Sequence, residues 1–374
     1  MPVIIRGIKK QIPVRTGRGG HFDRAVRELA PTIAELRSAG FRDVRASVGR
    51  RPGDRVKRRE FIRLIGGAAV AWPLAAHAQQ PKAPIIGILV PANPEPFRSE
   101  FQAGLRELGY REGQNIAFEF RSADGNSARL RELADDLVRL KVDIIVAALT
   151  PAATAARQAT TEIPIVMVSV GDPVATGLIS SLGRPGGNVT GLTSGGAELT
   201  AKTIELIREV LPSTKRVAAL ANAPDPFSKV FVDGVEDAGR KLGVAIQTFK
   251  VRGIDDFDAA FNAMVKEQAQ AVIVQLSLPR KPIVDHALKS RLPLFGPSPL
   301  LAQEGGLISY SPHQGDLYHR AAAYVDRILK GAKPANLPVE FPVRFELIVN
   351  LKTAKELGIT VPPAVIERAD KVIE

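Results

Sequence analysis

The sequence has no cysteine, and it has only one tryptophan and four tyrosines among 374 residues. The lack of cysteine excludes a disulfide framework, a thiolate metal site and a cysteine nucleophile. It also excludes a lipid anchor, because no cysteine follows the signal-like segment described below. Downstream of residue 78 no apolar run reaches the roughly 20 residues that a membrane-spanning helix needs.

Signatures of catalysis are also scarce. The chain lacks a G-x-S-x-G elbow, a P-loop and a G-x-G-x-x-G turn after its first predicted strand. None of its five histidines has the spacing of a metal pair: His21, His77, His286, His313 and His319. We therefore predict no catalytic residue, no metal site, no bound cofactor and no enzyme activity.

The net charge of +12 is concentrated near the N-terminus. Residues 1–63 hold 17 Lys and Arg against 6 Asp and Glu, which leaves 34 against 33 from Gln79 onward, a net of +1. A basic chain can indicate a nucleic-acid-binding protein, but the region after residue 78 is close to neutral. Nucleic acid is therefore not expected as a partner.

Residues 56–78 have the pattern of a twin-arginine-type export signal. A basic cluster with Arg58 and Arg59 precedes EFIR, an uncharged run of 13 residues follows, and AHA ends the segment. This is the order of an n-region, an h-region and a small-x-small cleavage site. We predict cleavage after Ala78 and export to the periplasm.

A secretory n-region is normally short, so residues 1–55 are unexpected. This stretch is rich in arginine and glycine, as in RTGRGG. We interpret it as a non-native or disordered N-terminal extension, with translation beginning near Val56. The alternative is a regulatory extension.

From residue 84 to the end, strand-like apolar runs alternate with helix-period segments. PIIGILV, for example, reads as a buried strand, and the following helix carries Phe97, Phe101 and Leu105 on one stripe. A short helix is predicted over 175–182. Continuous apolar strands joined by helices indicate parallel sheets covered on both faces. About ten strands predict an α/β protein with two Rossmann-like lobes.

Small and polar residues follow several predicted strands, where ligands of such sheets bind. Thr150 is placed to cap the next helix, whose free N–H groups would suit a carboxylate. Each residue alone could serve a turn or a cap, but their recurrence favours a binding cleft. The candidates from the strand ends are Asn93, Thr150, Pro151, Ala152, Ser169, Asp172, Asn222, Asp225 and Ser298. Tyr310, at a predicted lobe boundary, is a candidate ligand lid, with a packed interdomain residue as the alternative.

Several segments resemble one known family. GLRELGYREGQNIAFEFR, IPIVMVSVGDPVATGLISSLGRPGGNVTGLT, GGLISYSP and VEFPVRFELIVNLKTAKELGI are similar to ABC-transporter substrate-binding proteins of the tryptophan/tyrosine-binding type. The resemblance covers nearly all of residues 83–374. It implies a type I periplasmic binding protein, in which two lobes joined by three crossovers close on a small ligand.

The resemblance also implies where the lobes divide. The crossovers are expected near 192–195, 310–312 and 333–338. One lobe would then comprise 83–192 with 312–335, and the other 193–311 with 336–374. The loop after VQLS is shorter than is usual in the family, so Ser277 is a less certain contact.

In such a protein the ligand would be an amino-acid-like or carboxylate-bearing organic solute. Hydroxyls and helix N-termini would hold a carboxylate, while Asp172 or Asp225 could pair with an ammonium group. The expected partner is an ABC permease in the inner membrane, and the expected state is a monomer. Two alternatives stay open from the sequence: a receptor for a membrane signalling protein, or an exported α/β enzyme.

Overall fold

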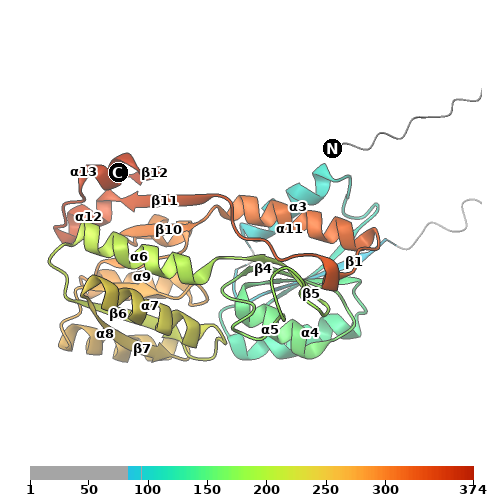
Figure 1. Ribbon diagram of the computed structural model, residues 1–374, viewed down its shortest axis with the longest axis horizontal. Coiled ribbons are helices and arrows are strands. Elements are labelled where there is room, and N and C mark those ends of the chain that lie inside the picture. The colour runs from blue at the N-terminus through green and yellow to red at the C-terminus, as the bar shows by residue number, and fades with distance from the viewer. Residues whose placement is uncertain (1–82, 94) are drawn as a thin grey trace, which may run out of the picture. The chain divides into compact units, whose positions relative to one another are not determined.

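The computed structural model describes residues 83–374, apart from Pro94 and the side chain of Ala197. The predicted extension at 1–55 and the predicted signal segment at 56–78 lie outside the described residues. Within the described part of the chain, no helix is long and apolar enough to cross a membrane. The described residues form two lobes, each built on its own β-sheet (Figure 1).

The first lobe contains a five-stranded sheet in the order β2-β1-β3-β4-β5. All of its strands pair in parallel, as the continuous apolar runs predict. Ile86 of β1, for instance, lies opposite Ile144 of β3. The strands are β1 (Ile85–Val90), β2 (Ala117–Ser122), β3 (Ile144–Ala148), β4 (Ile165–Val170) and β5 (Val189–Thr193).

Helices cover both faces of this sheet because alternate residues of each strand point to opposite sides. Ile144 and Val146 of β3 pack beneath one pair of helices, and Ile145 and Ala147 pack beneath the other. α3 and α11 lie side by side, and Gly104 allows their close approach (Figure 1). The helices are α3 (Phe97–Glu107), η1 (Ser127–Arg129), α4 (Leu130–Arg139), α5 (Leu149–Ala159) and α11 (Gln314–Leu329).

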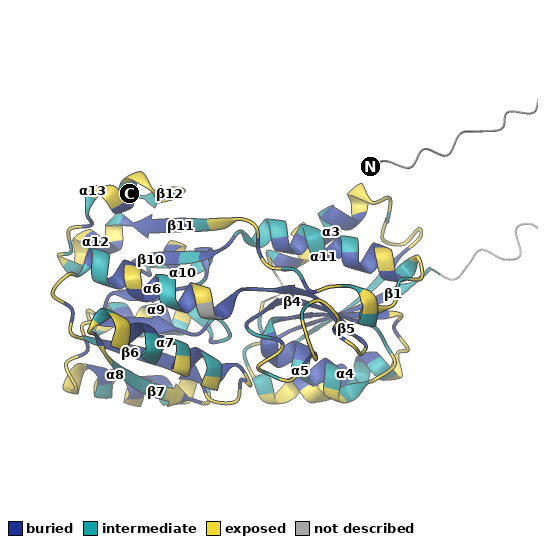
Figure 2. Cartoon of the chain, viewed as in Figure 1, coloured by how far each residue is buried: buried dark blue, intermediate teal, exposed yellow. Residues whose placement is uncertain are grey.

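The second lobe contains a seven-stranded sheet in the order β12-β11-β10-β9-β8-β6-β7. Its strands are parallel except for β10 and β11, which pair antiparallel. Figure 2 shows the inner strands of both lobes largely buried. The strands are β6 (Arg216–Asn222), β7 (Ala245–Val251), β8 (Ala271–Val274), β9 (Leu294–Gly296), β10 (Ile308–Pro312), β11 (Phe345–Asn350) and β12 (Lys371–Ile373).

The helices of the second lobe again form two layers. α6, α7, α12 and α13 pack on one face of the sheet, and α8, α9 and α10 pack on the other. They are α6 (Gly196–Val210), α7 (Ser228–Leu242), α8 (Phe257–Lys266), α9 (Arg280–Lys289), α10 (Pro299–Gln303), α12 (Leu351–Leu357) and α13 (Pro363–Glu367), with 3-10 turns η2 (Ile254–Asp256) and η3 (Pro334–Asn336). The predicted α/β class with two Rossmann-like lobes is confirmed.

Three segments connect the lobes: one between β5 and α6, one between β10 and α11, and one before β11. The third segment leaves the first lobe later in the chain than the expected 333–338. Glu340 still pairs with the first sheet, since its N–H donates to Gly191 O and its own oxygen accepts from Thr193 N–H, each at 3.1 Å. Arg320 of α11 also donates to the Glu340 carboxylate, at 2.5 Å.

The helix predicted over 175–182 is wrong, because this segment forms turns. The Asp172 carboxylate accepts the N–H groups of Val174 and Ala175, at 3.1 and 2.9 Å, which fixes a turn at its start. Gly177 then adopts a positive φ of 73°. Side-chain bonds of this kind compete with helix formation.

Candidate functional site

The carboxyl ends of the central strands of both lobes surround one continuous cleft. The space between the atoms is about 520 Å³ in its inner cavity and about 1610 Å³ in its outer cleft, with open solvent at the mouths included. Four residues line both spaces: Leu149 and Ser169 from the first lobe, and Leu276 and Ser277 from the second. Both lobes therefore contribute to one site, as parallel sheets with outer crevices favour.

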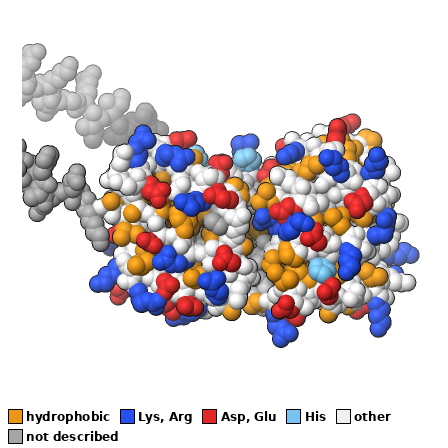
Figure 3. Space-filling view, turned by 180° about the vertical axis from the view of Figure 1, so that it is seen from behind, with side chains coloured by type: hydrophobic (Ala, Val, Ile, Leu, Met, Phe, Trp, Pro, Cys, Tyr) orange, Lys and Arg blue, Asp and Glu red, His pale blue; other side chains and the backbone are white. Residues whose placement is uncertain are grey.

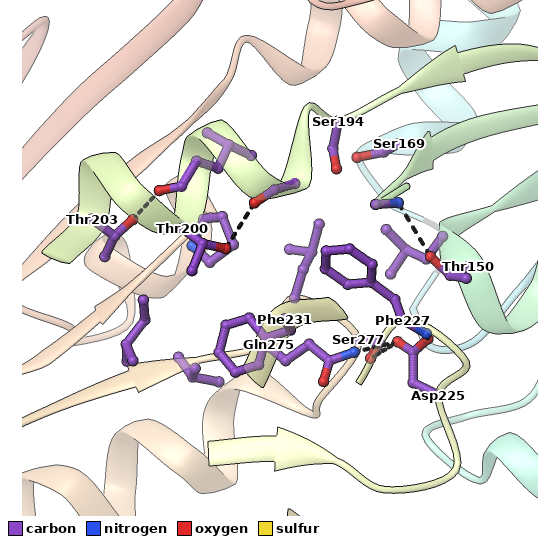
Figure 4. A pocket seen from close by; sticks show the side chains of 18 residues that line it. Thr150, Ser169, Ser194, Thr200, Thr203, Asp225, Phe227, Phe231, Gln275 and Ser277 are labelled. Carbon is purple, nitrogen blue, oxygen red and sulfur yellow. Dashed lines mark hydrogen bonds between the residues drawn. The ribbon is translucent and has the colours of Figure 1, made fainter. Parts of the chain in front are cut away.

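Asp225 is the buried charge of the inner cavity. It follows β6, and only 5% of its surface is exposed. Its carboxylate accepts the N–H of Phe227 at 2.8 Å, the amide of Gln275 at 2.6 Å and the hydroxyl of Ser277 at 2.5 Å (Figure 4). Burial raises the pKa of Asp225, and these three hydrogen bonds oppose the rise.

A second layer of side chains orients this carboxylate. Gln275 is 2% exposed, and its Oε1 accepts the backbone N–H of Asn222 at 3.0 Å, so its NH₂ group must face Asp225. Asn222 in turn donates to the Ser277 hydroxyl at 3.0 Å. Because every donor here is neutral, the charge of Asp225 is hydrogen-bonded without being neutralised. Among the described residues, no Lys or Arg charge shifts the pKa of Asp225.

The opposite wall comes from the ends of β3 and β4. Leu149 and Ser169 have positive φ values of 66° and 58°, in the left-handed region that costs a residue with a side chain about 1–2 kcal/mol. Strained residues of this kind gather at functional sites because surrounding structure holds them in place. Here they turn the chain at the rim of the cavity.

Thr150 does not cap its own helix, contrary to the sequence-based expectation. α5 begins at Leu149 with Ala148 as its N-cap and no side-chain cap bond. The Thr150 hydroxyl oxygen instead accepts the N–H of Gly171 at 3.2 Å, which joins the ends of β3 and β4. The expectation fails because the left-handed Leu149 starts the helix earlier than the T-P dipeptide indicates.

The remaining inner wall is mainly apolar. Phe227 and Phe231 enter it from the second lobe, beside Leu199 of α6 and Ile273 of β8 (Figure 4). Thr200 and Thr203 also line it, but each hydroxyl donates to a carbonyl one turn earlier in α6, at 2.7 and 2.8 Å. The cavity thus has a polar end near Asp225 and an apolar body.

The cleft brings together most of the residues expected from the sequence. Asn222 lies behind the wall, as described above. Pro151 lines a separate groove beside Thr154. The expected residues that line the inner cavity or the outer cleft are Asn93, Thr150, Ser169, Asp225, Ser277 and Ser298.

Three further expected residues, besides Asn222 and Pro151, line neither space. Ala152 lies on α5 and is fully buried in the core of the first lobe, so it is not accessible to a ligand. Asp172 uses its carboxylate in the turn described above. Tyr310 stacks on Phe345 with ring centroids 5.6 Å apart, and it packs against the core of the second lobe.

Other lining residues were not predicted. A signal existed for Gln275, a polar residue in the apolar run AVIVQLS. Phe227, Phe231 and Thr203 have the ordinary spacing of buried helix residues, so they could not be distinguished from core residues by their pattern. The cleft residues that sequence reasoning missed include Leu149, Ser194, Leu199, Thr200, Arg280 and Glu304.

Figure 3 shows acidic and basic side chains interspersed over the face seen from behind. No group of His, Cys, Asp or Glu suited to a metal ion occurs among residues 83–374 outside the undescribed positions. The chemistry of the cleft is therefore that of a polar pocket with one buried carboxylate, several hydroxyls and aromatic walls. Such a pocket can bind a small molecule with a cationic and an apolar part.

Comparison with known proteins gives a consistent result. Residues 92–373 match a family described as ABC transporter substrate binding protein. The chain is 30% identical over 262 residues to a tyrosine-binding protein of Clostridioides difficile, covering 69% of this chain and 75% of that one. Two crystal structures cover 78% of this chain and all of their own. They are an ABC domain from Streptococcus pneumoniae in complex with L-Trp (29% identity, TM-score 0.73) and a conserved domain protein from Vibrio cholerae (28%, 0.73).

Proposed function

The chain belongs to the ABC transporter substrate-binding protein family, and we propose that it captures a small amino-acid-like solute between its lobes for delivery to an ABC permease. Its relatives are substrate-binding proteins rather than enzymes. The proposal includes export directed by the segment at 56–78, cleavage after Ala78 and action in the periplasm as a monomer. It also takes the three crossovers as the boundaries between the two lobes.

The uncompensated carboxylate of Asp225 carries this proposal. A buried charge without a partner costs several kcal/mol, and a ligand ammonium group would supply the missing counter-charge. The second-lobe donors Gln275 and Ser277 already hold the carboxylate in place. Little side-chain order would then be lost on binding, which favours affinity.

The first lobe supplies groups suited to the carboxylate of the same solute. The hydroxyls of Thr150 and Ser169 line the cavity at the N-terminus of α5. A helix N-terminus presents backbone N–H groups and positive partial charge to an anion. An α-amino acid would thus bridge the lobes, with its carboxylate toward α5 and its ammonium group toward Asp225.

Phe227 and Phe231 would receive the apolar side chain of the solute. The similarity to a tyrosine-binding protein and to a domain in complex with L-Trp supports an aromatic amino acid. Because the two walls come from different lobes, the bound solute would stabilise the closed arrangement through contacts that exist only there.

Titration of the full chain with L-tyrosine and L-tryptophan, by calorimetry and by thermal unfolding, tests the proposal. A ligand at a thousand times its Kd should raise stability by about 4 kcal/mol, or roughly 8 °C in Tm. Asp225→Asn should weaken binding at least 100-fold, since it removes a buried charge pair. Asp172→Asn is the matched control, because that carboxylate also follows a strand but fixes a turn. Equal affinities for the wild type and Asp225→Asn would contradict the proposal.

A further inference from the structure

One side chain of the first lobe bridges two of the three crossovers, which are called first, second and third in chain order. Arg320 lies on α11, the helix that follows the second crossover. Its guanidinium group donates to the Glu340 carboxylate at 2.5 Å and to the backbone oxygen of Phe341 at 3.1 Å, both in the third crossover. It also lies 3.4 Å from the carboxylate of Asp316, one turn earlier in α11. One guanidinium group therefore joins the start of α11 to the third crossover.

The backbone of Glu340 joins the third crossover to the first. Leu192 and Glu340 form a parallel bridge, in which the N–H of Glu340 donates to Gly191 and its oxygen accepts from Thr193, each at 3.1 Å. These partners belong to β5, at whose end the first crossover begins. Glu340 therefore contacts β5 through its backbone and α11 through its side chain, so it links all three crossovers on the side of the first lobe.

The ion pair between Arg320 and Glu340 is partly shielded from water. The two side chains are 23% and 39% exposed. Burial opposes ionisation of the Glu340 carboxyl, but the hydrogen bonds and the positive charge of Arg320 hold its pKa below the usual value. Both groups are therefore charged near neutral pH. A guanidinium group with several acceptors in its plane restrains them more than an isolated surface pair would.

Beyond this pair the third crossover has a short joint. The backbone oxygen of Phe341 is held by the guanidinium group, and the backbone oxygen of Arg344 accepts the N–H of His313 at 2.9 Å, beside the paired strands β10 and β11. Pro342 and Val343 lie between these two held residues, and Val343 is 70% exposed. Hinge motions are absorbed by a few residues of this kind.

The first crossover turns at Gly195, which has a φ of 68° directly before α6. Because Glu340 ties the first and third crossovers together beside both joints, rotation at Gly195 accompanies rotation at Val343. Without the ion pair the third crossover would move more freely, and the lobes would gain freedom relative to each other. Closure on a solute has to remove such freedom, which weakens binding.

We propose that Arg320 is a positioning residue for closure: it holds the third crossover against α11, so that the three crossovers turn as one unit and the closed lobes release the solute slowly. The inference rests on the proposed function, because closure on a solute is what the joints serve. Arg320 lines neither the inner cavity nor the outer cleft. It would thus control affinity without contacting the solute.

Rapid-mixing measurements on the full chain with L-tyrosine and L-tryptophan test this role. Arg320→Met keeps the apolar stem and removes the guanidinium group. It should raise the dissociation rate about fivefold or more and leave the association rate within about twofold, because a looser joint shortens the life of the closed state. Arg320→Lys should give an intermediate rate, since an ammonium group is a point charge without the planar fork of arginine.

Arg368→Met is the matched control. Arg368 pairs with Glu209 at 2.7 Å within the second lobe and touches no crossover. Its loss removes a comparable ion pair, so both rates should stay within about twofold of the wild type. Melting curves of each variant establish that it is folded.

The double variant Arg320→Met/Glu340→Gln shows whether the two side chains act together. Glu340→Gln keeps the size of the side chain and the backbone bonds to β5, but it removes the charge. If the side chains work as a pair, the double variant should release the solute no faster than Arg320→Met alone. Effects that multiply would mean that they act independently, contrary to the proposal.

Hydrogen exchange of the solute-free protein gives a measurement that needs no ligand. The N–H groups of Val339, Glu340 and Thr193 bond across the third crossover. In Arg320→Met these amides should exchange about tenfold faster, while the amides of β3 keep their protection. A variant that only destabilised the first lobe would speed exchange in both places.

The outcomes separate the two proposals. Unchanged release of the solute in Arg320→Met, or faster exchange in β3 as well as in the third crossover, would overturn the positioning role while Asp225-dependent binding stands. Binding that does not depend on Asp225 would contradict the proposed function instead. If the wild type binds neither amino acid, the proposed function fails and the positioning role with it.

Discussion

The ring of Phe227 lies directly against the backbone of Gly171. A Cβ built on residue 171 would be 2.6 Å from two carbons of that ring, closer than real side chains approach. Gly171 follows β4 of the first lobe, and Phe227 follows Asp225 in the second. The same ring lies 2.4 Å from a Cβ built on Gly196, at the start of α6. Two glycines thus make a slot for Phe227 where the lobes meet.

Gly171→Ala should therefore weaken solute binding without removing any polar group of the cavity. The added methyl group meets Phe227, and overpacking of this kind costs about 1–3 kcal/mol. Since the ring and the glycine belong to different lobes, the cost falls on the closed arrangement. We expect a tenfold or greater loss of affinity by calorimetry, with scattering showing a less compact protein in saturating L-tyrosine.

Gly187→Ala is the control for this substitution. Nothing lies within 4 Å of a Cβ at residue 187, and its φ is not in the left-handed region. This variant should bind as the wild type does. Similar affinity in both glycine variants would show that the slot does not govern closure.

Binding should depend on pH through Asp225. Because burial raises the pKa of this carboxyl, it takes up a proton at a higher pH than an ordinary aspartate. The neutral acid no longer attracts an ammonium group. The affinity for L-tyrosine should then be constant near neutral pH and fall as the pH drops through the raised pKa. Calorimetry across this range should give a flat profile for Asp225→Asn and a wild-type profile for Asp172→Asn.

The ligand-free protein should show the linked effect on stability. Since the pKa of Asp225 is higher in the folded than in the unfolded protein, folding takes up a proton between the two values. This contribution to the free energy of unfolding is present at low pH and is lost as the pH rises through the raised pKa. Denaturant unfolding should thus show the wild type gaining stability relative to Asp225→Asn as the pH falls from 7. A difference that does not change with pH would contradict a raised pKa.

Ser169→Gly should raise the stability of the protein and lower its affinity for the solute. Ser169 has a φ of 58°, which glycine adopts without strain, so we expect a gain of about 1 kcal/mol in the free energy of unfolding. The same change removes a cavity hydroxyl, and we expect affinity to fall about tenfold. Lys141→Gly, at a φ of 54° and outside the cleft, should give the gain in stability alone. A loss of stability in Ser169→Gly would mean that the left-handed turn stores no strain.

The sequence predicts the fold well because each central strand is buried on both faces. Runs such as IIVAA in β3 then become continuously apolar, and this pattern cannot be mistaken for a surface strand. The sequence-based prediction fails at 175–182. There the hydrogen bonds of the Asp172 carboxylate and the positive φ of Gly177 outweigh the helical spacing of apolar residues. The prediction also omits α10, which has five residues, and β12, which has three, because such short elements show no hydrophobic period.

The candidate site was predictable where position along the chain determines it. Asp225 and Ser298 follow strands, and parallel strands bring their ends to one edge. Tyr310 was a candidate because it lies near a crossover, but the sequence could not show that it stacks on Phe345. Arg280 and Glu304 are distant in sequence and meet only after folding. Pairings of this kind depend on tertiary packing, which periodicity does not encode.

Because α11 lies late in the chain, the first lobe is completed late during synthesis. This helix covers one face of the first sheet with Leu317, Ala321 and Val325, yet it follows the strands of the second lobe up to β10 in the chain. The first lobe therefore cannot bury that face completely until the ribosome has passed residue 329. Until then only α3 covers this face, so part of the apolar sheet stays accessible, and exposed apolar strands are prone to aggregate. The N-terminal lobe is begun first and completed late, so we expect a chain arrested before α11 to aggregate more readily than the complete chain.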